Sequence, residues 1–417
     1  MLDIKLIKEK TSTVRQALEK RMPADKINLE RIIELDEERR GLITVIEALQ
    51  ADRNQASKTK PTPEVIVKMK ANGEEIKRIE SKLNTIESEL NADLAELPNL
   101  PADDVVAGDK ENNQVIKTFL KQPKFNFAIK DHVELATSLN IIDYERAVKM
   151  SGSGFWCYRG LGALLEWALL NYFIDFHTKN KYTFLLPPYL LTEKSAYTSG
   201  HLPKFKDDLF WTQDQLCLNA TSEMMLGNYH RDEILPIESL PIKYFAYSAC
   251  FRREAGSYRK EERGMVRGHQ FNKIEMFAFT KPEDSWEIFS ELLHNAEKLV
   301  EGLGLHYQTS KLAAGDCSTA MAKTCDIEVW IPSMGVYKEV SSVSNALEYQ
   351  ARRGNIRYKD ASAKNNFVHT LNASGLATSR LIPAILEQFQ TKDGSVIIPK
   401  ALRKYLPKGI KKIKALV

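Results

Sequence analysis

A charged stretch from Phe251 to Glu275 carries the clearest chemical signal in the sequence. Strand alternation places Arg252 and Glu254 on one face of a first predicted strand. The same rule places Phe271 and Glu275 together on a returning strand. If the two faces coincide, the pocket suits a nucleotide: the ring can stack on a base, a carboxylate can accept from an amine, and the guanidinium can neutralise a phosphate. A surface hairpin with interleaved charges fits the spacing about equally well.

These residues need a sheet to position them, and the later part of the chain predicts one. Its strand candidates are separated by hairpins or irregular loops rather than by regular helices, which favours an antiparallel sheet in an α+β domain. No GxGxxG or GxxxxGK[ST] sequence is present, so neither a Rossmann nor a P-loop site is indicated. The predicted elements are a helix over 162–176 and strands over 182–186, 242–254, 269–280, 327–330 and 336–340.

The first hundred residues predict a different kind of unit. Apolar residues alternate at spacings of three and four over 32–53 and again over 65–90, which predicts two long amphipathic helices. Pro61 and Pro63 deny helical conformation to the residues before them, so the chain reverses there. We therefore expect an antiparallel helical hairpin at about 28–96. A linker places the domain boundary near residue 107, between a unit over 1–107 and a unit over 108–417.

The positive charge of this hairpin is concentrated at its tip. Residues 26–97 have a net charge of −3, whereas residues 53–70 have a net charge of +4. The solvated end of a coiled coil and a phosphate-contacting tip both fit this distribution.

Composition limits the classes of protein that the chain can belong to. The 417 residues are 43% hydrophobic and 27% charged, enough for two domains with buried cores, which excludes disorder and collagen-like repetition. The net formal charge of +4 excludes a chain that coats nucleic acid by bulk charge. Five cysteines without CxxC or His/Cys ligand spacing indicate a reduced, cytosolic compartment and no structural zinc. We identify no signal peptide or membrane span.

The charged stretch reads FRREAGSYRKEERGMVRGHQFNKIE over 251–275 and resembles motif 2 of class II aminoacyl-tRNA synthetases in its seryl-tRNA synthetase form. The N-terminal hairpin resembles the tRNA-binding arm of the same family, so the resemblance spans essentially the whole chain. Further matching segments, in family order, are DHVEL at 131–135, FKDDLF at 205–210, TSE at 221–223, GD at 315–316, AKTCDIEVW at 322–330, KEVSS at 338–342, QARR at 350–353 and HTLNASGLA at 369–377.

The resemblance implies an ATP site. Arg252 would hold the α-phosphate, Glu254 would accept from the adenine amine, and Phe271 would stack on the ring. Arg380 matches the motif 3 arginine on the other side of the nucleotide; a cation at a helix start is disfavoured by the helix dipole, and a bound anion would explain it. The implied ATP-binding set is Arg252, Arg253, Glu254, Phe271, Glu339, Val340, Ser341, Ser342 and Arg380, with Arg252 and Arg380 as catalytic residues.

The resemblance also implies a magnesium site at Glu339 and Ser342, where a carboxylate and a hydroxyl would offer oxygen to a hard cation that bridges phosphates. Regular alternation would place these two residues on opposite faces of a strand. A bulge or a strand end must therefore lie between them.

The serine-binding positions of the family fall on Thr221, Ser222, Glu223, Glu275 and Ser374. A carboxylate can pair with the substrate ammonium while a second polar group satisfies the small hydroxyl. Buried polar groups left unpaired are costly, so such a site rejects analogues that lack the hydroxyl. Ser374 could instead be a helix-capping serine.

The implied protein is a cytoplasmic homodimer that activates serine with ATP and transfers the seryl group to tRNA(Ser), with tRNA(Sec) an open second acceptor. Arg53, Lys58 and Lys60 at the hairpin tip would contact the tRNA. The helix over 162–176 with its following strand resembles the dimer element, motif 1. Two alternatives are a class II synthetase for another small amino acid and a non-catalytic synthetase-like binding protein.

The sequence departs from the family pattern in three places. Ala373 stands in the usual Asn-Gly-Ser, the pair Thr378 and Ser379 replaces the commoner Val-Gly, and Lys181 stands where motif 1 usually has glycine. None of the departures removes a charged or metal-binding group, so they bear on backbone geometry and rates rather than on the reaction.

Overall fold

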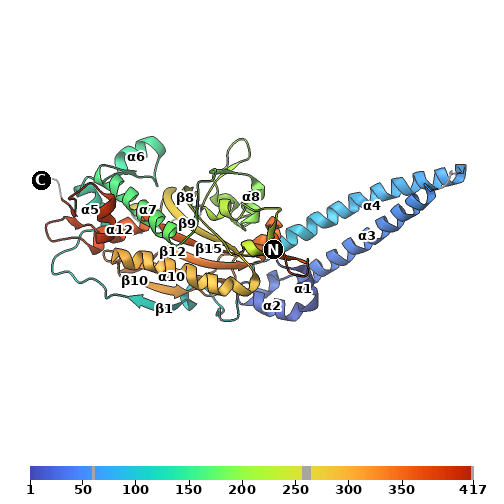
Figure 1. Ribbon diagram of the computed structural model, residues 1–417, viewed down its shortest axis with the longest axis horizontal. Helices are drawn as coiled ribbons and strands as arrows, with labels where there is room; N and C mark the ends of the chain where they lie inside the picture. The colour runs from blue at the N-terminus through green and yellow to red at the C-terminus, as the bar shows by residue number, and fades with distance from the viewer. Residues whose placement is uncertain (59–61, 256–263, 415–417) are drawn as a thin grey trace. The chain divides into compact units, whose positions relative to one another are not determined.

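The computed structural model describes residues 1–58, 62–255 and 264–414 (Figure 1). The chain divides into two compact units, Met1–Leu100 and Pro101–Val417. This division falls before the boundary near residue 107 that the sequence predicts. The reason is backbone pairing: Ala102 donates to the carbonyl of Ala322 at 2.9 Å, and Ala314 donates to the carbonyl of Val106 at 2.9 Å.

The first unit is entirely helical, and its long hairpin confirms the prediction for residues 28–96 (Figure 1). Its helices are α1 Ile4–Glu9, α2 Thr11–Glu19, α3 Leu29–Ala56 and α4 Pro63–Glu96. Asn28 caps α3, and Thr62 caps α4, which begins with Pro63 at its first position. Ile46, Ile76 and Ile79 form the buried seam between the two long helices.

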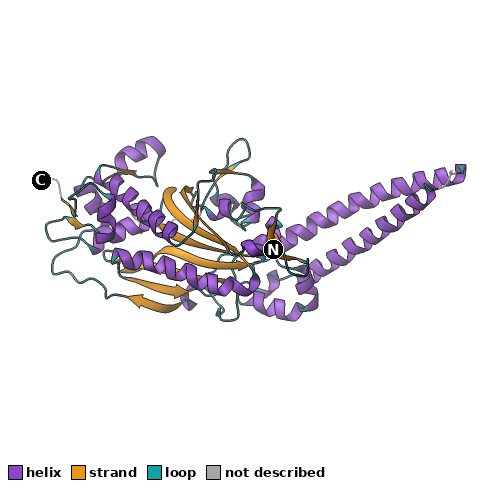
Figure 2. Cartoon of the chain, viewed as in Figure 1, coloured by secondary structure: helices purple, strands orange, loops and turns teal. Residues whose placement is uncertain are grey.

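The second unit is built on an eight-stranded sheet with the order β1-β10-β11-β12-β15-β9-β8-β4 (Figure 2, strands in orange). Every neighbouring pair is antiparallel except β4 with β8, so the predicted α+β class with a mostly antiparallel sheet is confirmed. The sheet strands are β1 Gln114–Phe119, β4 Thr183–Leu185, β8 Ile242–Phe251, β9 Gln270–Thr280, β10 Tyr307–Lys311, β11 Lys323–Ile331, β12 Val336–Leu347 and β15 His369–Ala377.

Helices and short strands complete this unit. The helices are α5 His132–Ser138, α6 Tyr144–Ser151, α7 Leu161–Lys179, α8 Glu193–Thr198, α9 Glu223–Leu226, α10 Ser285–Leu303, α11 Tyr349–Gly354 and α12 Thr378–Gln388. The short strands are β2 Ile142–Asp143, β3 Cys157–Tyr158, β5 Leu190–Leu191, β6 Cys217–Leu218, β7 Ile234–Pro236, β13 Arg357–Lys359, β14 Asn365–Phe367, β16 Val396–Ile397 and β17 Lys412–Ile413. Among the described residues, no helix is both long and apolar enough to cross a membrane.

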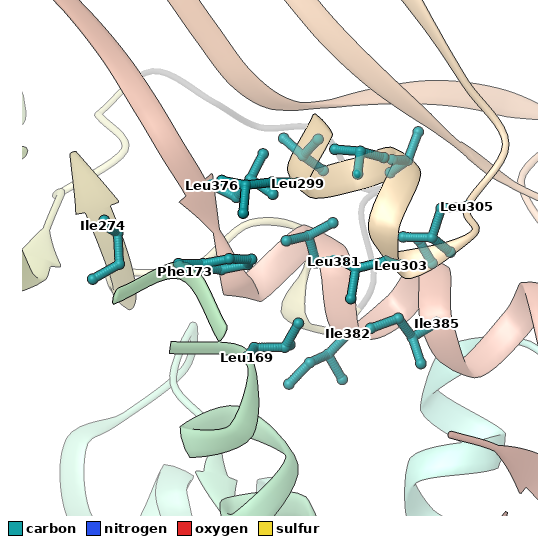
Figure 3. Close-up of a cluster of buried hydrophobic side chains, with 14 of the residues drawn as sticks. Leu169, Phe173, Ile274, Leu299, Leu303, Leu305, Leu376, Leu381, Ile382 and Ile385 are labelled. Carbon is teal, nitrogen blue, oxygen red and sulfur yellow. The ribbon is translucent and has the colours of Figure 1, made fainter. Parts of the chain in front are cut away.

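The main core lies where α7, α10 and α12 pack on one face of the sheet. Side chains from all three helices and from β9 and β15 interlock there, and each buried Leu, Ile or Phe contributes about 1.5–3 kcal/mol. The labelled members in Figure 3 are Leu169, Phe173, Ile274, Leu299, Leu303, Leu305, Leu376, Leu381, Ile382 and Ile385. This packing fixes β9, β15 and the start of α12 against one another.

Strand β9 presents its two faces to different surroundings. Ile274, Met276 and Ala278 enter the helical core, whereas Phe277 and Phe279 belong to a second cluster on the opposite face. Because both faces are buried, the register of β9 is fixed. Side chains at the other odd-numbered positions of β9 therefore lie on the face away from α7, α10 and α12.

Helix α7 ends in a tight turn that explains why motif 1 usually has glycine at position 181. Tyr182 donates its backbone N–H to the carbonyl of His177 at 3.1 Å, and Lys181 donates to the carbonyl of Thr178 at 3.1 Å. This pair of bonds is a Schellman motif, whose central residue adopts the left-handed conformation. Lys181 has φ of 63°, so this exposed lysine occupies a position that favours glycine.

We predict that Lys181→Gly raises the free energy of unfolding by up to about 1 kcal/mol. Relief of the left-handed strain, about 1–2 kcal/mol, exceeds the entropy that glycine adds to the unfolded chain. Thermal unfolding at fixed protein concentration measures the change. Lys181→Ala keeps the Cβ atom and should give no gain; a lower midpoint for Lys181→Gly would contradict the strain at this position.

Candidate active site

A cavity of about 380 Å³ opens on the sheet face away from the helical core. Strands β9, β12 and β15 and the segment that follows β8 line it together with residues 220–223. A smaller hollow of about 50 Å³ adjoins it and extends to Phe271 and Arg380. The two hollows share Arg252, Glu254, Arg267, Lys273, Glu339 and Ser374. Charged residues from distant parts of the chain therefore meet in one place.

A bulge in β12 brings Glu339 and Ser342 to the same side of the sheet. Ser341 pairs with Ile327, but Glu339 pairs with Glu328, so Val340 is an extra residue in the strand. Such an insertion reverses the alternation locally. Glu339 and Ser342 both line the cavity. The bulge that the sequence required between these residues is confirmed.

A second bulge ends strand β15. Ser374 pairs with Glu275 and Ala377 with Lys273, so three steps along β15 match two steps along β9. Leu376 takes φ of 88° within this bulge. Gly375 next to it has no room for a side chain, because an added Cβ atom would lie 2.6 Å from Nε2 of His177. Ser374 precedes this bulge and faces the cavity by regular alternation with Asn372, and the bulge lies between Ser374 and the start of α12.

The alternation rule fails at the end of β8. The sequence predicts a strand over 242–254, but β8 ends at Phe251, and Glu254 has φ of 53°. Pairing continues for one residue beyond the strand, because Arg252 donates its backbone N–H to the carbonyl of His269 at 2.9 Å, and the chain then turns at Glu254. Arg252 and Glu254 still line both hollows, so the prediction of a shared pocket holds for a different reason.

Two arginines approach the smaller hollow from opposite sides. The Arg252 guanidinium carbon lies 5.3 Å from the centre of the Phe271 ring. Arg380 donates from Nη1 to the Glu339 carbonyl at 2.8 Å and to Glu339 Oε2 at 3.3 Å. Arg267 donates from Nε to Glu254 Oε2 at 2.6 Å. The hollow thus combines guanidinium groups with an aromatic face.

The deeper end of the cavity holds two buried carboxylates and one buried cation. Lys273 forms an ion pair with Glu275 and donates to Oγ1 of Thr221. Glu223 accepts from Nε2 of Gln350 at 2.6 Å. Burial first, and then the charge of Glu275, raises the pKa of Glu223 to about 7. This end is suited to a small molecule that carries a cation and polar hydrogens.

Three side chains of the expected set do not line either hollow. Arg253 is exposed and donates to the carbonyl of Asp207 at 3.3 Å. Ser222 shares a hydrogen bond with the hydroxyl of Ser248 at 2.7 Å, and Ser341 donates to the carbonyl of Ser374. These contacts brace the walls of the site from outside. The expected residues that do line the hollows are Thr221, Glu223, Arg252, Glu254, Phe271, Glu275, Glu339, Val340, Ser342, Ser374 and Arg380.

Sequence reasoning missed two charged residues of the site. Lys273 lines both hollows, and it lies between Phe271 and Glu275 at the same strand spacing of two that selected them. The same alternation could therefore have found it. Arg267 also lines both hollows, but it precedes β9 and no periodicity signals it.

The basic tip of the hairpin is only partly within the described residues. Arg53, in the last turn of α3, and Lys58 are both exposed. Lys60 lies outside the described residues. Lys68 is 3.7 Å from Asp52, an exposed pair of little energetic weight. Positive charge at this tip thus faces solvent.

The second unit is built on a mostly antiparallel sheet whose cavity is lined by two arginines and two buried carboxylates. This arrangement is that of the catalytic domain of a class II aminoacyl-tRNA synthetase. Comparison with family models agrees. Residues 204–389 match the tRNA synthetase class II core domain (G, H, P, S and T), and residues 1–101 match the seryl-tRNA synthetase N-terminal domain.

Similar proteins identify the family. The chain is 51% identical to serine–tRNA ligase 2 of Clostridium acetobutylicum, over 98% of this chain and 99% of that protein. It is 47% identical to serine–tRNA ligase of Petrotoga mobilis, over 98% and 99% of the two chains. A seryl-tRNA synthetase from Pyrococcus horikoshii complexed with ATP has a TM-score of 0.92 and 34% identity, with 100% of both chains covered. The chain belongs to the seryl-tRNA synthetase family, and its activity is that of a serine–tRNA ligase.

Proposed function

We propose that the two hollows form one active site, in which serine occupies the deep end of the larger cavity and the nucleotide lies across the smaller hollow and the adjoining part of the larger cavity. The observation that carries this proposal is the convergence of Arg252, Arg380 and the buried Glu223 and Glu275 in adjoining hollows. The relative from Pyrococcus horikoshii, which contains ATP, supports the nucleotide assignment. The units Met1–Leu100 and Pro101–Val417 take the roles of tRNA-binding and catalytic domains.

At the nucleotide end the chain supplies positive charge and a ring. Phe271 stacks on the adenine, and Glu254 accepts from its amine. Arg252 and Arg380 neutralise the α-phosphate as the serine carboxylate attacks it and pyrophosphate leaves. A carboxylate is already a nucleophile, so the step needs in-line positioning and charge stabilisation rather than a general base. A ribose hydroxyl at the 3′ end of the tRNA then takes the seryl group, and AMP leaves.

At the amino-acid end the two buried carboxylates, Glu223 and Glu275, have different partners. Glu223 and Glu275 are both within reach of Lys273, whose ammonium group neutralises part of their charge in the free chain. The serine ammonium takes over one carboxylate. Thr221 and Ser374 offer oxygen atoms close to the remaining polar hydrogens.

The residues at the edge of the cavity fit a magnesium ion that is shared with phosphates. Glu339 and Ser342 provide a carboxylate and a hydroxyl, and the Oδ1 atom of Asp326 is buried without a hydrogen-bond partner among the described residues. Burial, and then the charge of Glu339, raises the pKa of Asp326. When bound, the cation would neutralise phosphate charge. The described ranges contain no group of three or more His, Cys, Asp or Glu that could hold a metal.

The proposal includes a homodimer formed through α7 and the strands that follow it. Large apolar side chains there are exposed in the single chain, which is typical of a surface that another chain covers. These residues are Leu164, Trp167, Phe184, Leu186 and Leu190. A cytoplasmic location is consistent with five cysteines that form no disulfide among the described residues. Charging assays with tRNA(Ser) and tRNA(Sec) transcripts test whether the second tRNA is also an acceptor.

Removal of the Arg252 guanidinium should reduce adenylate formation by at least about a hundredfold, the usual scale for one preorganised charge stabiliser. Serine-dependent ATP/pyrophosphate exchange with Arg252→Ala measures this, and tRNA binding should change little. Arg253→Ala is the matched control, because its side chain lies outside both hollows; we expect less than a tenfold loss. Exchange within a few-fold of the parent for Arg252→Ala would favour a non-catalytic binding protein.

Serine affinity should depend on pH through Glu223. Its pKa of about 7 means that the neutral form predominates at lower pH, where it cannot pair with the serine ammonium. The KM for serine should therefore rise below pH 7 by up to about tenfold per pH unit. Exchange kinetics between about pH 5.5 and 8.5 measure it. Glu223→Gln should have a high KM with a flat profile; an unchanged profile in that variant would assign the titration elsewhere.

The hairpin tip should grip the tRNA without taking part in serine activation. Arg53→Gln with Lys58→Gln should weaken tRNA binding and lower its salt slope by up to about 0.9 per lost phosphate contact. Lys77→Gln with Arg78→Gln is the matched control, because it removes the same charge from exposed positions further along α4. Equal effects of the two double variants on charging would show that tip position is irrelevant.

A larger change removes the outer part of the arm. Deletion of residues 51–72, closed by a short glycine-rich turn, removes the tip but keeps the seam at Ile46, Ile76 and Ile79. ATP/pyrophosphate exchange should stay at the parental level, and charging of tRNA(Ser) should collapse. Parental charging by a folded variant would make the arm a structural appendage.

A further inference from the structure

Glu166 of α7 is a buried carboxylate that belongs to neither hollow. It is 2% exposed and lies on the core face of the sheet. Its Oε1 atom accepts from Nδ2 of Asn272 at 2.7 Å and from Oγ1 of Thr378 at 2.6 Å. Its Oε2 atom is buried, and the hydroxyl of Tyr158 is close enough to the carboxylate to lower the pKa of Glu166. One oxygen of Glu166 thus ties three elements, α7, β9 and α12, together.

The two partners of Glu166 stand next to residues of the nucleotide site. Asn272 lies between Phe271 and Lys273 on β9, and alternation turns its side chain to the helical face while its neighbours face the hollows. Thr378 is the first residue of α12, two positions before Arg380. Glu166 therefore holds both walls of the smaller hollow from behind.

A second set of bonds makes this junction stiff. Tyr247 donates to Oδ1 of Asn272 at 3.1 Å, so both ends of that side-chain amide are bound. The hydroxyl of Thr378 also lies 3.2 Å from the backbone carbonyl of Asn272. The single hydroxyl hydrogen of Thr378 is shared between these two acceptors, with the shorter contact to Glu166, so the start of α12 is held close to β9.

A carboxylate at this buried position lowers the stability of the fold. Burial of a carboxylate costs several kcal/mol that two neutral donors recover only in part. Burial raises the pKa of Glu166 to about 7, against the lowering effect of its bonds to Thr378 and Asn272. An apolar residue would pack against the helical core at lower cost, so stability alone does not account for this residue.

We propose that Glu166 is a positioning residue for adenylate formation, which holds Phe271 and Arg380 at their productive separation through Asn272 and Thr378. This inference rests on the proposed nucleotide site. A displacement of about 1 Å in a group that positions the reacting atoms can lower the rate about a hundredfold. Hydrogen bonds that fix the residues behind the smaller hollow can therefore affect the rate of the reaction.

Three variants separate positioning from stability. Glu166→Leu removes both bonds and should lower kcat/KM for ATP in serine-dependent exchange by about 10- to 100-fold. Glu166→Gln keeps an oxygen acceptor at Oε1 and should stay within about threefold of the parent. Glu297→Leu is the matched control, because Glu297 is also buried and accepts from Thr309 at 2.7 Å and Lys117 at 2.6 Å, away from both hollows. It should lower thermal stability and leave exchange kinetics unchanged.

Thr378→Val provides a second measurement if Glu166→Leu does not fold. It removes one donor to Glu166 and should lower kcat/KM for ATP by a smaller factor, with no further loss when combined with Glu166→Leu. Parental kinetics in a folded Glu166→Leu protein, failure of Glu166→Gln to retain activity, or additive losses would overturn the proposal. Failure of the proposed site itself would instead appear as parental exchange in Arg252→Ala.

Discussion

The active site depends on one constraint, the burial of strand β9 on both of its faces. On one face Ile274 and Met276 are locked into the core formed with α7, α10 and α12. On the other face Phe277 belongs to a second buried cluster, so β9 cannot slip by one residue without exchanging apolar and charged side chains. The same alternation points Lys273 and Glu275 into the cavity. A buried charged site is thus held in place by apolar packing directly behind it.

Two bulges adapt this regular frame to its chemistry. In β12 the extra residue Val340 lets Glu339 and Ser342 face the cavity together. In β15 the bulge after Ser374 frees the chain to enter α12, which carries Arg380 to the smaller hollow. In an unbroken β12, Glu339 and Ser342 would lie on opposite faces of the sheet, so only one of them could line the cavity. Each bulge loses ladder hydrogen bonds only at the point in the strand where the side chains must converge.

Most of the fold could be predicted from the sequence because its signals are local and periodic. The spacing of apolar residues predicts both long helices of the hairpin, and the loops between strands favour the antiparallel sheet. Alternation was sufficient for Phe271 and Glu275, which lie in a regular strand. It failed at Glu254, because β8 ends at Phe251 and the backbone turns to φ of 53° at Glu254, a turn that no local pattern reveals.

Motif matching located the site but not the direction of each side chain. Ser222 and Ser341 stand inside matching segments, yet their hydroxyls bond to the walls behind the cavity. Conversely, Lys273 lies in the segment that resembles motif 2, where the resemblance gives it no role, and yet it lines both hollows. The direction of a side chain depends on tertiary packing and on bulges. The spacing of Glu339 and Ser342 indicates that a bulge is needed, but spacing alone does not show where in the strand it lies.

The charge balance of the cavity explains how a small polar substrate can be selected. In the free chain Lys273 pairs with Glu275 and Thr221, so these three buried polar groups are satisfied before substrate enters. Under the proposed roles, the serine ammonium must compete with Lys273 for a carboxylate, and the displaced lysine is then available to the substrate carboxylate. A ligand binds favourably only if it forms a new hydrogen bond for every one that it breaks in the free site. Alanine cannot do so, because without a hydroxyl it leaves a buried polar group unpaired at a cost of about 1–3 kcal/mol. Selectivity therefore comes from the pairing that already exists in the free site and that an incomplete substrate cannot replace.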